Sequence, residues 1–295
     1  MGLFFGAYCS FVFCQPLFSA EWFLGLKTIE AKEFVLNEDN GKKISELHWE
    51  SQDVPFLGIQ LAWMPTTWSK IYGRYETQIK HGTSIMKDSD WMDETTSLPT
   101  HYSWHPQTDL KEMNQWEIGV ELPLFKTQHW QTAFLLNFEN IYSRWDAKGG
   151  FYQYPDGAGS FPNDASIIGY QQWVRIPSVG ILIRYNQGPW MGSLEMKASR
   201  WVKAWDQDDH WQRLMRFKDK VQNADYFSLQ ARVGYEIFSD TVLFLNAGLN
   251  RMSTEYGSTL VTDLVDRESW KIEGDSAGMN FKSSFVFVGL GKIFF

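Results

Sequence analysis

Apolar and polar residues alternate with a period of two along much of this chain. The alternation is clearest in residues 57–63, 116–122, 227–237 and 243–249, and few windows have helical spacing. Successive side chains of a strand point to opposite faces, so the pattern predicts strands with one apolar face. The other face carries full charges, as expected of a barrel interior that is wet or filled by polar networks.

The turn residues predict about ten antiparallel strands. Brief reversals alternate with longer polar segments, which we expect to be loops. The reversals are residues 65–68, 123–128, 186–189 and 239–241, and the longer segments are residues 85–113, 146–166, 204–213 and 253–279. Outer-membrane barrels combine short periplasmic turns, long external loops and an even number of strands. A soluble β-sandwich is the alternative, but it accounts poorly for a final strand that ends on Phe295.

The N-terminal segment predicts export. Residues 1–20 contain no charged side chain and hold an apolar run at residues 3–13. This run is shorter than the roughly 20 residues that a membrane-spanning helix needs, so we expect a signal peptide that is cleaved before Glu21. The barrel domain would then cover residues 21–295 and contain no cysteine, because both cysteines precede it.

Composition narrows the class of membrane protein. The formal net charge of −8 argues against nucleic acid as a partner. Aromatic residues make up 17% of the chain and charged residues 21%, and no segment after Ala20 is apolar for long enough to span a membrane as a helix. Strands that are apolar on one face, with aromatic girdles at the membrane interfaces, explain both observations. We therefore expect an all-β, antiparallel transmembrane barrel.

Residues 206–210 contain three carboxylates and one imidazole in a strand-like context. An extended chain places Asp206, Asp208 and His210 on one face, because side chains alternate. An imidazole beside carboxylates suits general-base activation of water, with Asp208 orienting His210.

A second acidic pair, Asp88 and Asp90, repeats the i, i+2 spacing far upstream. If the first strand runs outward, then Glu33 and the two clusters fall at the outer ends of the first, third and seventh strands. They would then line one cleft in the barrel mouth. The pair would hold the attacking water, and one of its carboxyls would carry a proton because like charges repel.

Other interpretations of these residues stay open at this point. Acidic loop ends are often only solvated or bind calcium, and residues 88–90 resemble the start of a calcium loop without its later Gly and Glu. One histidine with carboxylates is a poor zinc site. His81 and Ser84 lie three residues apart, but a serine hydrolase needs a base that is held by a third group.

Several motifs together resemble the omptins, the outer-membrane aspartyl proteases of Gram-negative bacteria. The motifs stand in the family's order at residues 41–49, 88–93, 105–108, 149–150, 160–163, 168–170 and 206–211. The resemblance covers essentially the whole mature chain. It implies a ten-stranded barrel that extends above the outer membrane, with an aspartic-type endopeptidase site facing outside.

The resemblance also implies roles for individual residues. By residue-level match, Asp208 and His210 are similar to the catalytic dyad, and Asp88 and Asp90 to the second catalytic pair. The substrate-binding pocket is similar at three positions, where a basic side chain before the scissile bond would be received. These positions are Glu33, Met86 and Asp206. Charge-assisted hydrogen bonds would favour Arg over Lys in such a pocket, because Arg binds bidentately.

The implied partners are cationic peptides or protein loops, lipopolysaccharide and outer-membrane lipid. The implied protein is a monomer without a metal or other cofactor, although lipopolysaccharide would serve as an activating lipid. The chain departs from the family's usual residues in two places that bear on substrate preference and lipid binding. His101 stands where the family typically has an acid, and Tyr142 and Trp173 stand where it often has Arg. Arg144 and Arg175 lie near these positions and could serve lipid phosphates.

Two other function classes use the same scaffold. A catalytically silent barrel could act as an adhesin or receptor through its external loops. A porin is the third class, but a barrel of about ten strands should have an interior largely filled by side chains.

Overall fold

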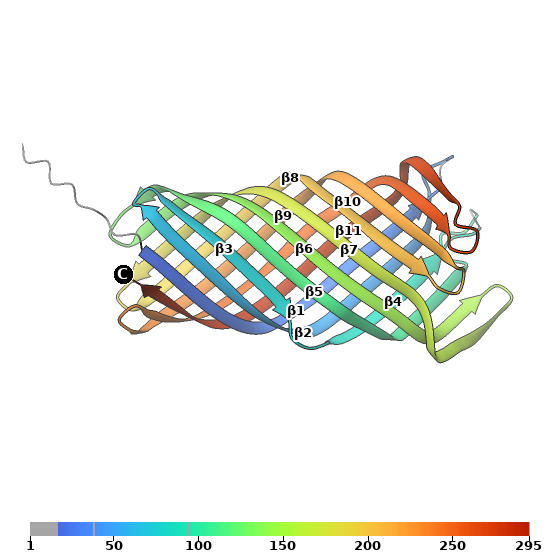
Figure 1. Ribbon diagram of the computed structural model, residues 1–295, viewed down its shortest axis with the longest axis horizontal. Helices are drawn as coiled ribbons and strands as arrows, with labels where there is room; N and C mark the ends of the chain where they lie inside the picture. The colour runs from blue at the N-terminus through green and yellow to red at the C-terminus, as the bar shows by residue number, and fades with distance from the viewer. Residues whose placement is uncertain (1–16, 38, 94, 295) are drawn as a thin grey trace, which may run out of the picture.

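The structure is a computed structural model that describes residues 17–37, 39–93 and 95–294. Its regular elements are all strands (Figure 1), and none of the described residues forms a helix long and apolar enough to cross a membrane. The strands are β1 (Leu17–Leu36), β2 (Lys43–Thr66), β3 (Ser69–Gln78), β4 (Thr83–Asp90), β5 (His101–Lys126), β6 (Trp130–Tyr154), β7 (Gly157–Gln187), β8 (Trp190–His210), β9 (Met215–Phe238), β10 (Thr241–Asp263) and β11 (Ser269–Phe294).

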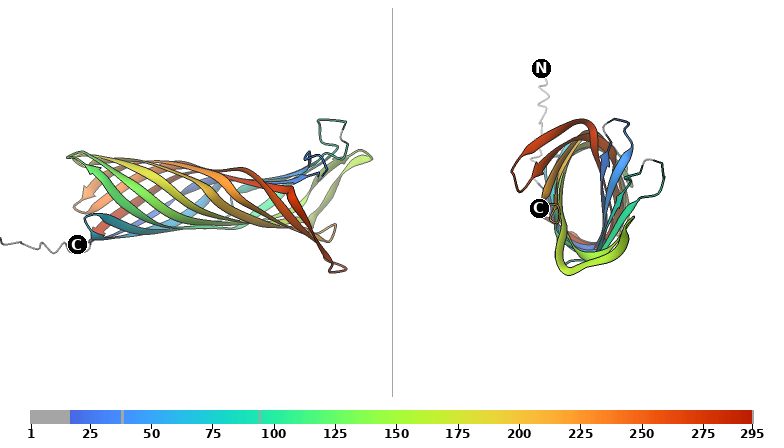
Figure 2. Two further views of the ribbon diagram at one scale, coloured as in Figure 1. Left: turned by 90° about the horizontal axis from the view of Figure 1, so that it is seen from above. Right: turned by 90° about the vertical axis from the view of Figure 1, so that its right-hand side faces the viewer.

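The sheet closes into a ring. Neighbouring strands pair antiparallel, and β1 pairs with both β2 and β11 (Figure 2). Strands β3 and β4 share one position, because each pairs with β2 on one side and with β5 on the other. The eleven described strands therefore occupy ten positions, and the predicted all-β antiparallel barrel is confirmed.

The strands are far longer than a membrane requires. β7 has 31 residues, whereas a tilted strand crosses the bilayer in about 9–11. The expectation that residues 85–113, 146–166, 204–213 and 253–279 are loops was wrong, since most of each segment is strand and the reversals are short. These segments resemble loops in sequence because an outward face that meets water, rather than lipid, need not be apolar.

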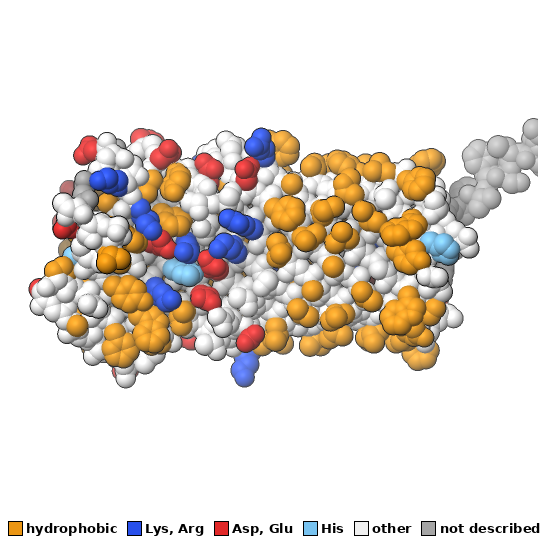
Figure 3. All heavy atoms as spheres, turned by 180° about the vertical axis from the view of Figure 1, so that it is seen from behind, with side chains coloured by type: hydrophobic (Ala, Val, Ile, Leu, Met, Phe, Trp, Pro, Cys, Tyr) orange, Lys and Arg blue, Asp and Glu red, His pale blue; other side chains and the backbone are white. Residues whose placement is uncertain are grey.

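The outer surface has two halves of different chemistry. Exposed apolar side chains cover the half that contains the start of β1 and the end of β11, whereas charged side chains gather on the other half (Figure 3). Leu24, Leu57, Ile118, Leu245 and Val286 are among the exposed apolar residues. A belt of this kind is stable in lipid, so the charged half is the part that extends above the membrane.

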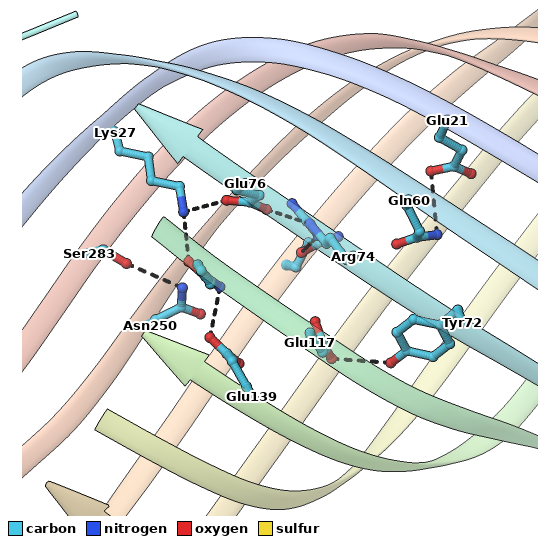
Figure 4. Close-up of polar contacts among 12 residues, drawn as sticks. Glu21, Lys27, Gln60, Tyr72, Arg74, Glu76, Glu117, Glu139, Asn250 and Ser283 are labelled. Atoms are coloured by element: carbon cyan, nitrogen blue, oxygen red, sulfur yellow. Dashed lines mark hydrogen bonds and ion pairs between the residues drawn. The ribbon is translucent and has the colours of Figure 1, made fainter. Parts of the chain in front are cut away.

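Paired charges fill the interior at the level of the membrane (Figure 4). We call this group the ionic layer, and its members are Lys27, Arg74, Glu76, Gln115, Glu117, Glu139 and Lys197. Lys27 and Arg74 both pair with Glu76, and Lys197 Nζ lies 2.7 Å from Glu117 Oε1. Side chains therefore block the lumen at this level, as expected of a barrel of this size.

An aromatic cluster separates the ionic layer from the outer mouth. Trp49 stacks on Tyr170 with ring centroids 5.4 Å apart, and Trp145 packs against both rings. All three side chains are fully buried. Along β1, Trp49 pairs with Ala31, which lies between Lys27 of the ionic layer and Glu33 of the mouth. The cluster thus forms an apolar floor beneath the mouth.

The two chain ends lie partly outside the described residues. Residues 1–16 of the predicted signal peptide are outside them, whereas residues 17–20 begin β1 and pair with β2 and β11. Cleavage before Glu21 stays a prediction. Phe295, on which the final strand was expected to end, is also outside the described residues.

Candidate functional site

The barrel mouth collects every predicted site residue. Glu33 lies on β1. Met86, Asp88 and Asp90 lie on β4, and Asp206, Asp208 and His210 lie on β8. β4 holds the third position in the ring and β8 the seventh, so the two clusters stand on facing walls. The long strands position them well above the lipid-facing belt.

Asp208 and His210 form a directly bonded pair on β8. His210 Nε2 lies 2.5 Å from Asp208 Oδ2, and the Asp208 side chain is fully buried. The edge of the His210 ring meets Phe217, with centroids 5.2 Å apart. Burial alone would lower the pKa of His210, but the charge and hydrogen bond of Asp208, with the charge of Asp88, raise it. The imidazole is therefore held in place as a strong base.

Asp88 and Asp90 form the second pair, on the opposite wall. Burial, followed by the charge of Asp90, raises the pKa of Asp88 to about 7. Asp88 Oδ1 is buried without a hydrogen-bond partner. Arg213, in the turn after β8, reaches back across the mouth and places Nη2 3.9 Å from Asp90 Oδ2. The charges of His210 and Arg213 both act on Asp88, so the two walls share one electrostatic site.

Glu33 and Asp206 are buried acids beside the dyad. Asp206 accepts hydrogen bonds from the Tyr170 hydroxyl and from the Asp219 N–H, each at 3.1 Å. Glu33 Oε2 has no hydrogen-bond partner. Burial, followed by the charges of neighbouring carboxylates, raises the pKa of both acids well above the usual range. Met86 on β4 is fully buried and pairs with Trp49 of the aromatic cluster across the β2–β4 ladder. The pocket therefore favours a cation strongly.

Two residues of the mouth were missed by the sequence reasoning. Asp219 on β9 is buried, and the charges of Asp206 and Asp219 repel each other. Tyr170 belongs to one of the motifs noted above but was given no role, although its hydroxyl holds Asp206. Extending the alternation of residues 227–237 back along the same strand would place Asp219 on the outward face, but an irregularity at Asn223, whose φ is 64°, shifts the alternation by one residue and turns Asp219 inward. The sequence pattern therefore gave no signal for Asp219.

The structure separates other candidate residues from the site. His81 Nδ1 lies 2.6 Å from the Leu110 carbonyl oxygen, whereas the Ser84 hydroxyl lies 2.8 Å from that of Ser51, so His81 and Ser84 do not form a pair. Asp209 points away from the mouth, as expected, and Arg216 Nε binds it at 2.5 Å. That ion pair ties β8 to β9. Within the described residues, no three His, Cys, Asp or Glu side chains are arranged to hold a metal ion.

Comparisons with known proteins agree with this geometry. The family model described as the omptin family matches residues 16–294. The chain is 28% identical to the plasminogen activator of Yersinia pestis over 268 residues, covering 90% of this chain and 86% of that protein. It is also 28% identical to the outer membrane protease OmpP of Escherichia coli K12 over 284 residues, which cover 94% of this chain and 90% of OmpP. The crystal structure of the outer membrane protease OmpT from E. coli superimposes with a TM-score of 0.90 at 25% identity, covering 94% and 97%.

Proposed function

The chain belongs to the omptin family and is an outer-membrane protease of the Gram-negative envelope, and we propose that it is an aspartic-type endopeptidase that cuts after Arg or Lys. The substrates are cationic peptides and exposed loops of proteins outside the cell. The observation that carries this proposal is the acidic pocket beside the dyad.

The pocket lacks a counterion of its own. The charges that act most strongly on Glu33 are all carboxylates, namely those of its neighbours in the mouth. Buried like charges are costly, and a cationic side chain that enters the pocket relieves this cost through charge-assisted hydrogen bonds. Binding of a basic residue before the scissile bond is therefore favoured, and the dyad lies immediately above it on β8.

The two walls of the mouth divide the chemistry between them. His210 Nε2 faces Asp208, so the lone pair of Nδ1 is available to take a proton from water. The water oxygen then bonds to the scissile carbonyl carbon. The C–N bond breaks, and the departing amine receives the proton that His210 took from the water. Asp88 is suited to hold the water and to donate a hydrogen bond to the carbonyl oxygen, because its raised pKa keeps a proton available near neutral pH.

The residue after the cut meets a different surface. His101 stacks at a tilt against Tyr154, with ring centroids 5.0 Å apart, where an acid would have attracted a basic side chain. We expect little preference for a basic residue at that position.

Lipopolysaccharide is the activating lipid in this proposal. Outside the barrel, Trp173 stacks on Trp205 with centroids 6.0 Å apart, and the Arg175 guanidinium lies 4.5 Å above the Trp205 ring. Arg144 and Lys203 are exposed on the adjoining strands. Cations beside a flat aromatic surface suit the phosphates and sugars of a glycolipid head group. The protein needs no metal and acts as a monomer in this proposal.

The decisive experiment compares variants of three neighbouring residues. Asp208→Ala and His210→Ala should leave a folded, heat-modifiable barrel that has lost cleavage of an Arg-containing peptide by about 10²–10⁴-fold. Asp209→Asn is the matched control, because Asp209 lies on the same strand but faces away, and it should cleave normally. The assay is run with and without lipopolysaccharide.

Two outcomes count against the proposal. Undiminished cleavage by the Asp208 or His210 variant would show that the dyad does not carry the reaction. A folded wild-type protein that cuts no dibasic peptide even with lipopolysaccharide, but binds host proteins, would instead support an adhesin or receptor.

A further inference from the structure

Asp219 stands directly opposite Asp206 in the sheet. Trp205 on β8 pairs with Lys220 on β9, and the same register places Asp206 across from Asp219. The Asp219 N–H donates to Asp206 Oδ1 at 3.1 Å. Only 2% of Asp219 is exposed, so its side chain lies inside the barrel. Like charges directly opposite each other destabilise a sheet, so this pairing is unfavourable for the fold alone.

The Asp219 carboxylate also lacks partners. Neither of its oxygens makes a hydrogen bond of good geometry, although the Thr259 hydroxyl lies close by. The lysines on either side of it, Lys218 and Lys220, are exposed on the outer face. A buried acceptor without a partner costs free energy, and this one faces two further acids, Glu33 and Asp206. A bound cation would remove that cost.

We propose that Asp219 is a specificity-determining residue that joins Glu33 and Asp206 in a three-carboxylate pocket selective for Arg over Lys. This inference rests on the proposed function, since it concerns the pocket for the residue before the cut. The three acids come from β1, β8 and β9, so they approach a bound side chain from three strands.

Donor counts explain the selectivity. A guanidinium carries five N–H donors in a flat fork, whereas an ammonium carries three donors at a single point. Two carboxylates accept only some of the five guanidinium donors, and the third carboxylate accepts the rest. A Lys ammonium offers each acid at most one hydrogen bond, and does so only where all three converge on its single nitrogen, so it satisfies the buried carboxylates less fully than Arg does. Asp219 is available for this role because Tyr170 holds Asp206, whereas the Thr259 hydroxyl near Asp219 makes no hydrogen bond of good geometry with it.

The test measures Arg against Lys in one peptide scaffold. Asp219→Asn keeps the size of the side chain and removes its charge, and Asp219→Ser is a second variant with a smaller side chain. Asp225→Asn is the matched control, because Asp225 lies on the same strand with 62% of its side chain exposed. Wild-type protein and all variants are assayed for kcat and KM with lipopolysaccharide, after heat-modifiable gel mobility has shown that each barrel is folded.

The expected result is a fall in the ratio of kcat/KM for the Arg peptide to kcat/KM for the Lys peptide. Losing a hydrogen bond to a charged group should lower kcat/KM for the Arg peptide about tenfold, mainly through KM, and leave the Lys peptide nearly unchanged. An Arg-to-Lys ratio that stays at the wild-type value in both Asp219 variants would overturn the inference. An equal loss of kcat/KM for the Arg and Lys peptides would also overturn the inference, because it indicates a structural role for Asp219. Failure of the wild-type protein to cut either peptide would instead overturn the proposed function.

Discussion

The ionic layer and the barrel mouth both bury several charges, but only the ionic layer balances them. In the layer, Lys27 and Arg74 pair with Glu76, and Lys197 pairs with Glu117. In the mouth, carboxylates come from four strands, and the cationic groups that act on them among the described residues are His210 and the half-exposed Arg213. Balanced charges fill and fix the lumen, whereas unbalanced charges leave the mouth with an excess of negative charge, which is the basis of the proposed specificity for basic residues. Counterions therefore distinguish structural from functional charges here more clearly than burial does.

The largest expected contrast comes from removing one carboxylate in each region. Glu76→Gln leaves Lys27 and Arg74 without their shared partner, and breaking a buried pair in this way costs about 3–5 kcal/mol. Asp206→Asn should not lower stability, because it removes one of several repelling acids. Urea unfolding in detergent micelles measures both variants. Equal stability of the two would remove the distinction between the regions.

The buried acids of the mouth should make stability depend on pH. The pKa values of Asp88 and Asp219 are each raised from 3.8 to about 7 in the folded protein, chiefly by burial. At a pH between 3.8 and about 7, these two carboxyl groups have lost their protons in the unfolded chain but retain them in the folded chain. The free energy of unfolding therefore falls as pH rises. We expect a loss of about 1 kcal/mol per pH unit for each group between pH 5 and pH 7. The double variant Asp88→Asn, Asp219→Asn should flatten this slope, and a wild-type stability that rises from pH 5 to pH 7 would contradict the expectation.

The smallest effect is expected at Arg213, a cation that reaches the acidic wall from the turn after β8. Its charge lowers the pKa of Asp88, so Arg213→Gln should move the pH profile of kcat/KM slightly to the alkaline side. The effect should be small because 57% of the Arg213 side chain is exposed and its contact with Asp90 is long, at 3.9 Å. A pH titration with one Arg peptide measures the midpoint, and an acid shift would show that the assumed sign is wrong.

Much of the fold followed from the alternation of side chains. Period two at residues 116–122 and 227–237 predicted one-sided strands, and counting reversals predicted the ring of ten positions. The lengths of the strands did not follow, because β7 and its neighbours continue into water, where the outward face carries polar residues. A polar strand end and a loop are alike in composition, and only the pairing partners distinguish them.

The gathering of the candidate residues in the mouth was predictable where two of them share one short segment. Asp88 with Asp90, and Asp208 with His210, are visible because the i, i+2 spacing places them on one face without knowledge of the fold. Asp219 was not visible in this way, since its relation to Asp206 depends on the register across the β8–β9 turn. Lys218 and Lys220 also make its surroundings resemble an ordinary exposed strand.

The filled lumen has a consequence for the cell that carries this protein. A surface enzyme built as an open barrel would admit antibiotics and bile salts with every copy inserted. Here the ionic layer and the aromatic cluster around Trp49 block that route, so a solute that enters the outer mouth does not pass through the barrel. The envelope can therefore display many copies of the enzyme without losing its function as a permeability barrier.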